Sequence, residues 1–363
     1  MTSREDQILQ LIKDDPFIQQ QQIATLLNIS RSSVAVHIMN MTKKGVIRGK
    51  GYIVNPPRYV VVIGGTNIDV VGQPQSTLIP RDSNPGHVSH SSGGVGRNIA
   101  ENLARLGTDV KLISVVGDDT YGNLVLNQTR RAGVDVRAVN ILKGQTTSTY
   151  LSLLDHDGDM LAAVADMSIL DKLDVSLISQ HADIIRHAES IVVDTNLSDS
   201  VLAYIFSHFS DQAIYLDTVS ATKAVKARPY LSHIHTLKPN LVEAQMISGL
   251  PVDSKNDINN VADWFIAQGV KRLFLSMGAD GILFRTLRHE RLIQAPSTKV
   301  INANGAGDAF LAGLAHAQIN GMDEDTASDF AIHCSGLAME HINTINPDIT
   351  ELLVQQRMEG AKC

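Results

Sequence analysis

The sequence predicts an α/β fold in which a mostly parallel sheet carries helices on both faces, preceded by a small helical domain. Short apolar runs, such as 59–65 and 190–194, alternate with segments of helical periodicity, such as 121–132. Apolar runs of this kind are typical of parallel strands buried on both sides. The length of 363 residues leaves room for one large α/β domain and a small one.

Composition places the chain among globular proteins of a reducing compartment. It has 44% hydrophobic and 19% charged residues, which is ordinary for such proteins. No apolar run is long enough to cross a membrane, and the first residues lack the apolar stretch of a secretory signal. The spacing of Cys334 and Cys363 suggests neither a disulfide nor a metal site. We therefore expect a cytoplasmic protein.

Charge is distributed unevenly along the chain. The net charge is −7, yet residues 1–58 contain eight Lys or Arg against four Asp or Glu. A basic N-terminal part followed by an acidic body suggests two functions on one chain. Pro56 and Pro57 mark the expected linker, so the first domain is predicted to cover residues 1–55.

The N-terminal part is expected to form three helices and a hairpin. Helical periodicity covers 4–13, 20–27 and 31–44, and Ser30 is expected to cap the third helix. Residues 46–54 have the pattern of a small hairpin. This order of elements resembles a winged helix-turn-helix module.

Such a module implies contact with DNA. The third helix would turn polar side chains toward the major groove, and basic residues around the hairpin would meet phosphates. An alternative is a docking or dimerisation element that does not touch DNA. The expected DNA-facing residues are Arg31, Ser32, Ser33, His37, Lys43, Lys44, Arg48 and Lys50.

The body is expected to contain the parallel sheet. Its predicted strands are 59–65, 109–116, 190–194, 213–217, 234–238 and 272–276, and its predicted helices include 96–106, 121–132 and 261–268. In such folds ligands bind beyond the carboxyl ends of the strands.

Two stretches of the body break this alternation. Residues 86–92 and 146–165 alternate polar and apolar side chains, as half-exposed strands do, and the second contains a turn at 155–158. We expect a small antiparallel flap that projects over the ligand site and keeps water from it. An ordinary sheet edge is the alternative.

The most informative stretch is 304–313, where a Gly-Ala-Gly turn opens an apolar helix. The N–H groups of Gly305, Ala306 and Gly307 would point at one spot, where the helix dipole favours an anion such as phosphate. Asp308, in the first turn, could take a proton from a hydroxyl group while these N–H groups hold the charge of a transferring phosphoryl group. An ordinary helix start with a favourable acidic residue is the alternative.

Two motifs in this order resemble the signatures of the ribokinase-like (PfkB) carbohydrate kinase family. The first is Gly-Gly-Val-Gly-Arg-Asn-Ile-Ala at 93–100, and the second is Gly-Ala-Gly-Asp at 305–308. Residues 238–243 and 276–281 agree with them. The resemblance covers about 59–355 and implies a three-layer α/β/α sandwich with a small β-lid.

Within that family the chain is most similar to the bacterial pseudouridine kinases. This similarity implies ATP- and Mg²⁺-dependent phosphorylation of the 5′-hydroxyl of pseudouridine. Other nucleosides such as inosine or adenosine, or a ribose-like sugar, remain alternative substrates. The stretches that carry the similarity are 65–70, 82–86, 147–155, 165–167 and 235–240.

The resemblance also implies roles for individual residues. Asp308 would be the base, beside the N–H groups of Gly305, Ala306 and Gly307. Substrate ligands would be Asn67 and Asp69, expected at the end of the first strand, with Gly93, Gly94, Asn98 and Asp166. Asp194 and Asn196 are further candidates. Nucleotide contacts would come from Asn240, Glu243, Ser276, Gly278, Gly281 and His333, with Glu243 reaching Mg²⁺ indirectly.

Several of these residues have structural alternatives. Asn67 and Asp69 also suit a turn cap, and Asn98 suits a helix start. The pair Asn240 and Glu243 is also typical of a surface helix, and His333 of any core or surface position.

One departure from the family pattern concerns a monovalent cation. Many relatives carry Asp-Thr-Thr before the glycine turn, where the Asp helps to hold such an ion, whereas this chain has Asn302, Ala303 and Asn304. The neutral Asn302 leaves activation by K⁺ open.

The family further implies a homodimer through the flaps. A metabolite-sensing transcription regulator with a kinase-like body is the alternative from another functional class.

Overall fold

The computed structural model describes residues 2–48 and 58–360. The chain divides into two compact units, Met1–Pro57 and Arg58–Cys363. In the described parts no helix combines the length and the apolar character that crossing a bilayer requires.

The N-terminal unit contains α1 (Ser3–Asp14), α2 (Gln20–Leu26) and α3 (Arg31–Lys43), close to the three predicted helices. Ser30 caps α3 as expected, because its Oγ accepts a hydrogen bond of 3.1 Å from the N–H of Ser33. Apolar side chains from all three helices form one core. Most of the predicted hairpin at 46–54, with Lys50, lies outside the described residues.

The larger unit is built on one nine-stranded sheet within residues 58–360. Its strands pair in parallel from β5 to β11, and the last two pairs are antiparallel. The sequence patterns did not predict β5, β12 or β13. The order across the sheet is β13 (Glu290–Ile293), β12 (Ile282–Arg285), β11 (Arg272–Ser276), β10 (Thr236–Lys238), β9 (Ala213–Asp217), β8 (Ser190–Asp194), β1 (Val60–Ile63), β4 (Val110–Gly117) and β5 (Val139–Leu142).

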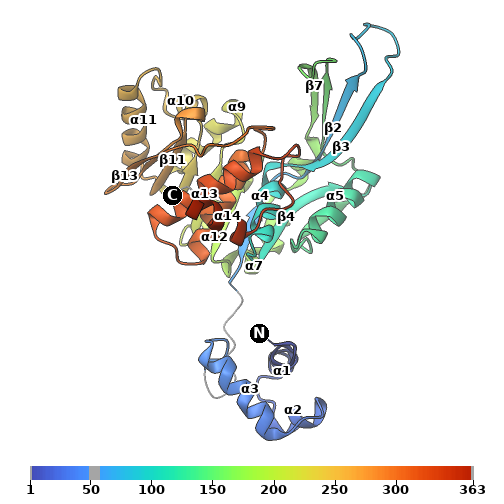
Figure 1. The fold of residues 1–363 in the computed structure, drawn as a ribbon, viewed down its shortest axis with the longest axis vertical. Helices are drawn as coiled ribbons and strands as arrows, with labels where there is room; N and C mark the ends of the chain where they lie inside the picture. The colour runs from blue at the N-terminus through green and yellow to red at the C-terminus, as the bar shows by residue number, and fades with distance from the viewer. Residues whose placement is uncertain (1, 49–57, 361–363) are drawn as a thin grey trace. The chain divides into compact units, whose positions relative to one another are not determined.

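Helices cover both faces of this sheet (Figure 1). Because side chains alternate along a strand, Val61 and Val193 enter one core while Val62 and Val192 enter the other. The first face carries α6 (Val175–Gln180), α7 (Ala182–Arg186), α8 (Asp199–His208), α9 (Ala221–Ala224), α10 (Leu241–Ser248) and α11 (Lys255–Ala267). The second carries α4 (Val95–Arg105), α5 (Thr120–Arg131), α12 (Ala306–Ile319) and α13 (Glu324–Met339), and α14 (Glu351–Gly360) packs on α13. This is the predicted three-layer α/β/α arrangement.

Of the three predicted helices of the body, only the start of α11 differs clearly. Helical periodicity suggested a helix from residue 261, but α11 begins at Lys255. Ser254 caps it, since its Oγ accepts a hydrogen bond of 3.2 Å from the N–H of Asp257. The polar first turn of this helix has no apolar periodicity, so the pattern missed it. The remaining short helices are η1 (Ser168–Lys172), η2 (Val225–His233) and η3 (Gly278–Asp280).

A second sheet forms the lid, which projects from the body in Figure 1. Its strand order is β3 (Gly86–Gly93), β2 (Asn67–Pro74), β6 (Thr149–Leu154) and β7 (Met160–Asp166). Two expectations are corrected here. Asn67 and Asp69 belong to lid strand β2 rather than to the end of the first strand, and β2 pairs with β6 in parallel, so the lid is mixed.

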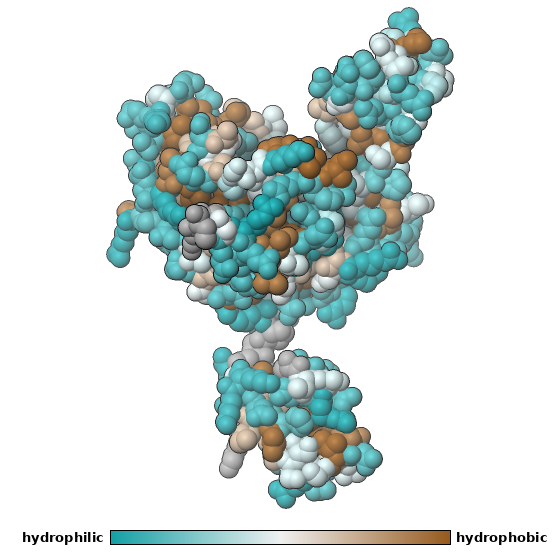
Figure 2. All heavy atoms as spheres, in the orientation of Figure 1, coloured by the Kyte–Doolittle hydropathy of each residue, from teal (hydrophilic) through white to brown (hydrophobic). Residues whose placement is uncertain are grey.

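The lid keeps several apolar side chains exposed, among them Val88, Leu161 and Val164. Figure 2 shows apolar surface on this part of the molecule among polar side chains. Exposed apolar area of this kind is compatible with the expected homodimer, which stays a prediction.

Candidate functional site

Charged side chains gather where the central parallel strands end. Asp194 ends β8, Asp217 ends β9 and Lys238 ends β10. Both carboxylates are buried, and the Lys238 ammonium lies 3.5 Å from an oxygen of Asp217. Charges are buried only where partners compensate them, so this edge of the sheet is a candidate for chemistry.

Asp308 joins this group from the first turn of α12. Gly305 caps the helix in a left-handed conformation, with φ of 79°, and a side chain there would collide with the carbonyl of Thr344. Asp308 is only 8% exposed, and its Oδ2 accepts a hydrogen bond of 2.9 Å from Asn98. A side chain at Gly307 would collide with the Lys238 ammonium, so this glycine lets Lys238 reach the helix start.

The charges and burial around Asp308 make its carboxylate a better proton acceptor than a free aspartate. Burial and the negative charge of Asp217 raise the pKa of Asp308, whereas Asn98 and Lys238 oppose the rise. Burial lowers the pKa of Lys238, but the carboxylates of Asp217, Asp308 and Glu243 outweigh it and raise that pKa overall. Lys238 therefore stays charged next to a carboxylate that holds a proton more readily than a free aspartate.

Asn98 is held in place by a buried arginine. Arg97 Nη1 donates a hydrogen bond of 2.9 Å to Asn98 Oδ1, which fixes the amide so that its nitrogen faces Asp308. Arg97 itself pairs with Glu101 and is 3% exposed. Asn98 therefore orients Asp308, and its remaining N–H is the group available to a ligand.

Asp194 ties together the turns that surround the site. Its carboxylate accepts hydrogen bonds from the N–H groups of Gly65 at 2.8 Å, Gly96 at 2.9 Å and Asn196 at 2.9 Å. A side chain at Gly64 would collide with this carboxylate. Burial raises the pKa of Asp194 to about 6. All these contacts are with backbone, so Asp194 acts as a structural clamp, and the Oδ1 of Asn196 accepts a hydrogen bond from Lys223.

At the base of the lid, Asn67 and Asp69 form a pair. The amide of Asn67 donates a hydrogen bond of 2.7 Å to Asp69, and burial raises the pKa of that carboxyl group. Gly93 lies opposite Asn67 in the neighbouring strand, and a side chain there would collide with Asp69. Gly94 has φ of 100°, which only glycine adopts easily. Gly93 therefore leaves space beside Asp69, whereas Gly94 leaves space for the carbonyl of Gly65.

Asp166 occupies a different place from these residues. Tyr150 pairs with both Asp69 and Ala165, so strand alternation puts Asp166 on the opposite face of the lid from Asp69. Its carboxylate accepts hydrogen bonds from the N–H and hydroxyl of Ser168. The expected contact between Asp166 and a substrate stays a prediction.

Asn240 and Glu243 form a capping box at the start of α10. Each side chain accepts a hydrogen bond of 2.9 Å from the other residue's N–H. Glu243 Oε2 also accepts a hydrogen bond of 2.6 Å from Thr218, whereas Oε1 has no partner among the described residues. The pair is thus structural, with one carboxylate oxygen left for a ligand.

The remaining expected nucleotide contacts lie around β11 and α13. Ser276 donates a hydrogen bond of 3.2 Å to the carbonyl of Pro239. Gly278 begins η3 and Gly281 follows it, both with positive φ. His333 Nδ1 contacts the carbonyl of Asp329 within α13. None of these contacts distinguishes a nucleotide site from ordinary loop and helix structure.

Asn302, which replaces the Asp that many relatives carry before the glycine turn, forms hydrogen bonds with both polar atoms of its side-chain amide. Its Nδ2 donates a hydrogen bond of 2.9 Å to the carbonyl of Ile342, and its Oδ1 accepts one of 2.9 Å from the N–H of Asn304. A cation could bind this side chain only by displacing one of these bonds.

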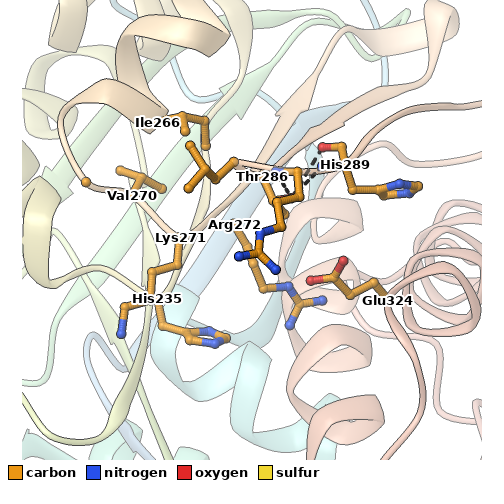
Figure 3. Close-up of a pocket in the computed structure, with 11 residues that line it drawn as sticks. His235, Ile266, Val270, Lys271, Arg272, Thr286, His289 and Glu324 are labelled. Atoms are coloured by element: carbon orange, nitrogen blue, oxygen red, sulfur yellow. Dashed lines mark hydrogen bonds between the residues drawn. The ribbon is translucent and has the colours of Figure 1, made fainter.

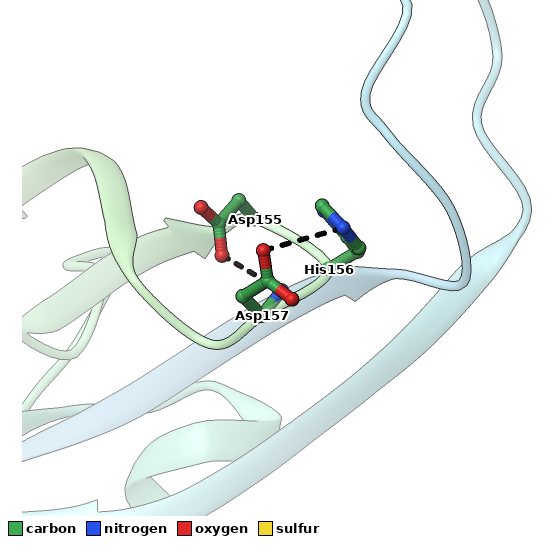
Figure 4. A group of neighbouring side chains, drawn as sticks. All are labelled: Asp155, His156 and Asp157. Atoms are coloured by element: carbon green, nitrogen blue, oxygen red, sulfur yellow. Dashed lines mark hydrogen bonds and ion pairs between the residues drawn. The ribbon is translucent and has the colours of Figure 1, made fainter.

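The lid turn holds a group of Asp155, His156 and Asp157 (Figure 4). The carboxylate of Asp155 accepts hydrogen bonds of 2.9 Å and 2.8 Å from the N–H groups of Asp157 and Asp159. His156 lies 3.3 Å from Asp157. These bonds explain the group as part of a tight turn.

In the N-terminal unit, Arg31, Lys43 and Arg48 are exposed, and Ser33 and His37 are half-buried on α3. The exception among the expected phosphate contacts is Lys44, whose ammonium pairs with the buried Glu5 at 2.8 Å. The ammonium of Lys44 therefore stabilises the packing of α3 against α1 within this unit.

Sequence reasoning assigned no role to Asp217, Lys238 or Arg97. Asp217 ends an apolar run just as Asp194 does, which is a signal that was present in the sequence. Lys238 and Arg97 were noticed only as parts of motifs, because nothing local shows that Lys238 faces Asp217 or that Arg97 is buried.

Comparison with known proteins identifies the family to which this chain belongs. Residues 57–351 match the model of the pfkB family of carbohydrate kinases. The chain belongs to this family. It is therefore a phosphotransferase that acts on a hydroxyl group, and its relatives place it among kinases of sugars and nucleosides. Residues 6–48 match a model described as winged helix-turn-helix DNA-binding, which confirms the predicted type of N-terminal module.

Two Escherichia coli K12 proteins are similar over most of their length. One, the uncharacterized sugar kinase YeiI, is 39% identical, with 96% of this chain and 97% of that protein covered. The other, pseudouridine kinase, is 44% identical, with 84% of this chain and 98% of that protein covered. The solved structure of Arabidopsis thaliana ribokinase complexed with ribose and ATP superposes with a TM-score of 0.77 at 20% identity, covering 84% of this chain and 99% of that one. This last likeness confirms the ribokinase-like fold.

The clamp formed by Asp194 predicts a stability effect. In Asp194→Asn, an NH₂ group would face one of the N–H donors that the carboxylate now satisfies. We expect a loss of about 2–3 kcal/mol, measured as the free energy of unfolding in urea, because a buried donor is left unpaired. The matched control is the exposed Asp211→Asn, expected to change stability by less than about 0.5 kcal/mol. Equal stability of the two variants would contradict the clamp.

Proposed function

We propose that the protein transfers the terminal phosphoryl group of ATP to the 5′-hydroxyl of pseudouridine. The observation that carries the proposal is the buried Asp308, placed beside Lys238 at the N-terminus of α12. The choice of pseudouridine as the substrate rests on the 44% identity to the pseudouridine kinase of Escherichia coli K12.

Asp308 would act as the general base. The substrate hydroxyl gives its proton to the Asp308 carboxylate, its oxygen bonds to the γ-phosphorus, and the bond from that phosphorus to the leaving ADP oxygen breaks. A raised pKa suits this role, since the carboxylate must be ionised before transfer yet able to hold a proton after it. The amide of Asn98 keeps the carboxylate oriented toward the reacting oxygen.

Two groups are placed to stabilise the charge of the transferring phosphoryl group. The N–H groups of Gly305, Ala306 and Gly307 begin α12, where the helix dipole favours an anion. The ammonium of Lys238 lies against Gly307 and remains charged. Together these groups offer fixed positive charge in a buried setting, where it is most effective.

The ribose would be held at the base of the lid. Asp69 is partnered at one oxygen by Asn67, which leaves the second oxygen for a sugar hydroxyl. Gly93 and Gly94 would allow the sugar to approach the backbone beside it. In this arrangement the lid carries specificity and the body carries catalysis.

Glu243 fits an indirect role toward Mg²⁺. It is buried, one of its oxygens is fixed by Thr218 and Asn240, and the other can hold a water molecule of a hydrated ion. Bound with ATP, Mg²⁺ would neutralise phosphate charge.

A substrate panel tests this proposal. The purified protein is given Mg²⁺–ATP with pseudouridine, uridine, inosine, adenosine or ribose, and ADP release is measured. We expect kcat/KM for pseudouridine to exceed that for each of the others at least tenfold, a margin of about 1.4 kcal/mol in transition-state binding. Preference for a nucleoside with an N-glycosidic bond, or for ribose, would contradict the choice of substrate. No turnover of any acceptor would favour the sensor alternative.

The control for the panel is Asp308→Asn. This variant keeps the size and the hydrogen bond acceptor of the side chain but loses the base. We expect kcat to fall by about 10³-fold or more while nucleoside binding changes little. Near-normal turnover in Asp308→Asn would show that another group is the base.

We also propose that the N-terminal unit binds DNA. Its match to a winged helix-turn-helix model supports this second function, as do the exposed Arg31 and Lys43 on α3. Because Lys44 is paired with Glu5, we expect it to contribute to folding of the unit more than to phosphate contact.

DNA binding is tested with the full-length protein and a mixed-sequence duplex. Fluorescence anisotropy should show binding that weakens at least tenfold between 50 and 200 mM salt, because phosphate contacts release counterions. The double substitution of Arg31 and Lys43 by Ala should weaken binding, whereas the exposed Lys13→Ala on α1 should not. Absence of binding at low salt, or equal loss in Lys13→Ala, would contradict this second function.

A further inference from the structure

A cavity of about 490 Å³ opens at the opposite ends of the strands from Asp308 (Figure 3). His235 lies just before β10, Lys271 lies just before β11, and Arg272 is the first residue of β11. Parallel strands place all their amino ends on one edge of the sheet, so this pocket is separated from the candidate active site by the length of the strands. The proposed kinase reaction leaves it without a role.

The pocket is strongly cationic. Lys271, Arg272 and Arg288 line it, and the one carboxylate among the lining residues is Glu324. Neither Lys271 nor Arg288 has an ion-pair partner in the described part of the chain. Burial, together with the positive charges of Arg272 and Lys271, lowers the pKa of His235 to about 4.

Arg272 is the most unusual residue of the pocket. It is only 6% exposed, forms no ion pair among the described residues, and its Nε has no hydrogen bond partner. Among the described residues its Nη1 donates a hydrogen bond of 3.3 Å to Gln318, and the hydroxyl of the buried Tyr215 lies close to the guanidinium. The guanidinium is held over the ring of Phe274, 5.5 Å from its centre. A buried cation with free donors is unfavourable unless an anion completes it.

Figure 3 shows Arg272 directed into the cavity, with the side chains of His235 and Glu324 facing the same space. Glu324 lies in the first turn of α13, where the helix dipole offsets its charge. Its carboxylate could accept hydroxyl groups of a ligand whose anionic end reaches Arg272. Ile266 and Val270 add an apolar wall for the body of such a ligand.

We propose that this pocket binds a phosphate monoester of a sugar or nucleoside. The phosphate would pair with the fork of Arg272, which matches oxyanions in geometry, and the exposed Lys271 and Arg288 would supply the remaining charge. Inorganic phosphate shares the anionic chemistry but would leave the apolar wall and Glu324 unused. The site is independent of the proposed reaction, because it shares no residue with it.

The position of the anion is tested first. Crystals of the full-length protein are soaked in tungstate, a tetrahedral oxyanion whose anomalous scattering locates each bound ion separately. We expect a peak within hydrogen-bond distance of the Arg272 guanidinium. Peaks confined to the start of α12, or to the protein surface, would overturn the proposal.

Affinity in solution is tested by calorimetric titration with ribose 5-phosphate and with inorganic phosphate. The double substitution of the exposed Lys271 and Arg288 by Ala spares the buried Arg272, and it should weaken ribose 5-phosphate binding at least tenfold. Arg228→Ala, an exposed arginine outside the pocket, is the matched control and should bind as the unaltered protein does.

Two results of the calorimetric titration would overturn the proposal. Equal affinity of the double variant and the control would assign the measured binding to another site and overturn the proposal. Inorganic phosphate that binds as tightly as ribose 5-phosphate would overturn the assignment to an ester. The kinase assay is not used here, so failure of the proposed reaction would leave this result unaffected.

Discussion

The structure depends on keeping a carboxylate buried at the N-terminus of α12 without neutralising it permanently. Burial alone would hold Asp308 protonated, and Asp217 adds to that tendency. The ammonium of Lys238 and the amide of Asn98 oppose it. In the folded protein the raised pKa favours the protonated form at low pH, and this contribution to stability is lost as the pH rises through the folded-state value. The result is a buried carboxyl group whose protonation is set by three neighbours.

The surrounding fold is arranged so that these neighbours can approach. Gly307 leaves room for Lys238, and Gly64 leaves room for Asp194, which fastens the turn after β1 to the start of α4. Helix α4 in turn presents Asn98, which Arg97 orients. Gly64 just after β1 and Gly307 of the second family motif thus permit the close approach of charged groups.

Much of this could be predicted from local patterns. Apolar runs located β8, β9 and β11, and the Gly-Ala-Gly turn located the start of α12. Contacts between distant segments could not be predicted, such as the bond from Asn98 to Asp308 across 210 residues. Strand β2 was missed because its polar residues follow a glycine turn and resemble a loop. The pair of Asp217 and Lys238 was missed because strand order must be known before two strand ends become neighbours.

The pH dependence of kcat/KM tests most directly whether the neighbours of Asp308 control its protonation. The acid limb of this profile reports the pKa of the base in the free enzyme. The substitution Asp217→Asn removes a negative charge that raises the pKa of Asp308. It also releases Lys238 from its ion pair with Asp217, so that the ammonium can interact more strongly with Asp308. Both effects lower the pKa of Asp308. We predict that the acid limb moves to lower pH by about one unit or more relative to the unaltered protein, with Asp211→Asn unchanged. An acid limb at the same pH in all three proteins would contradict the assignment of Asp308 as the base.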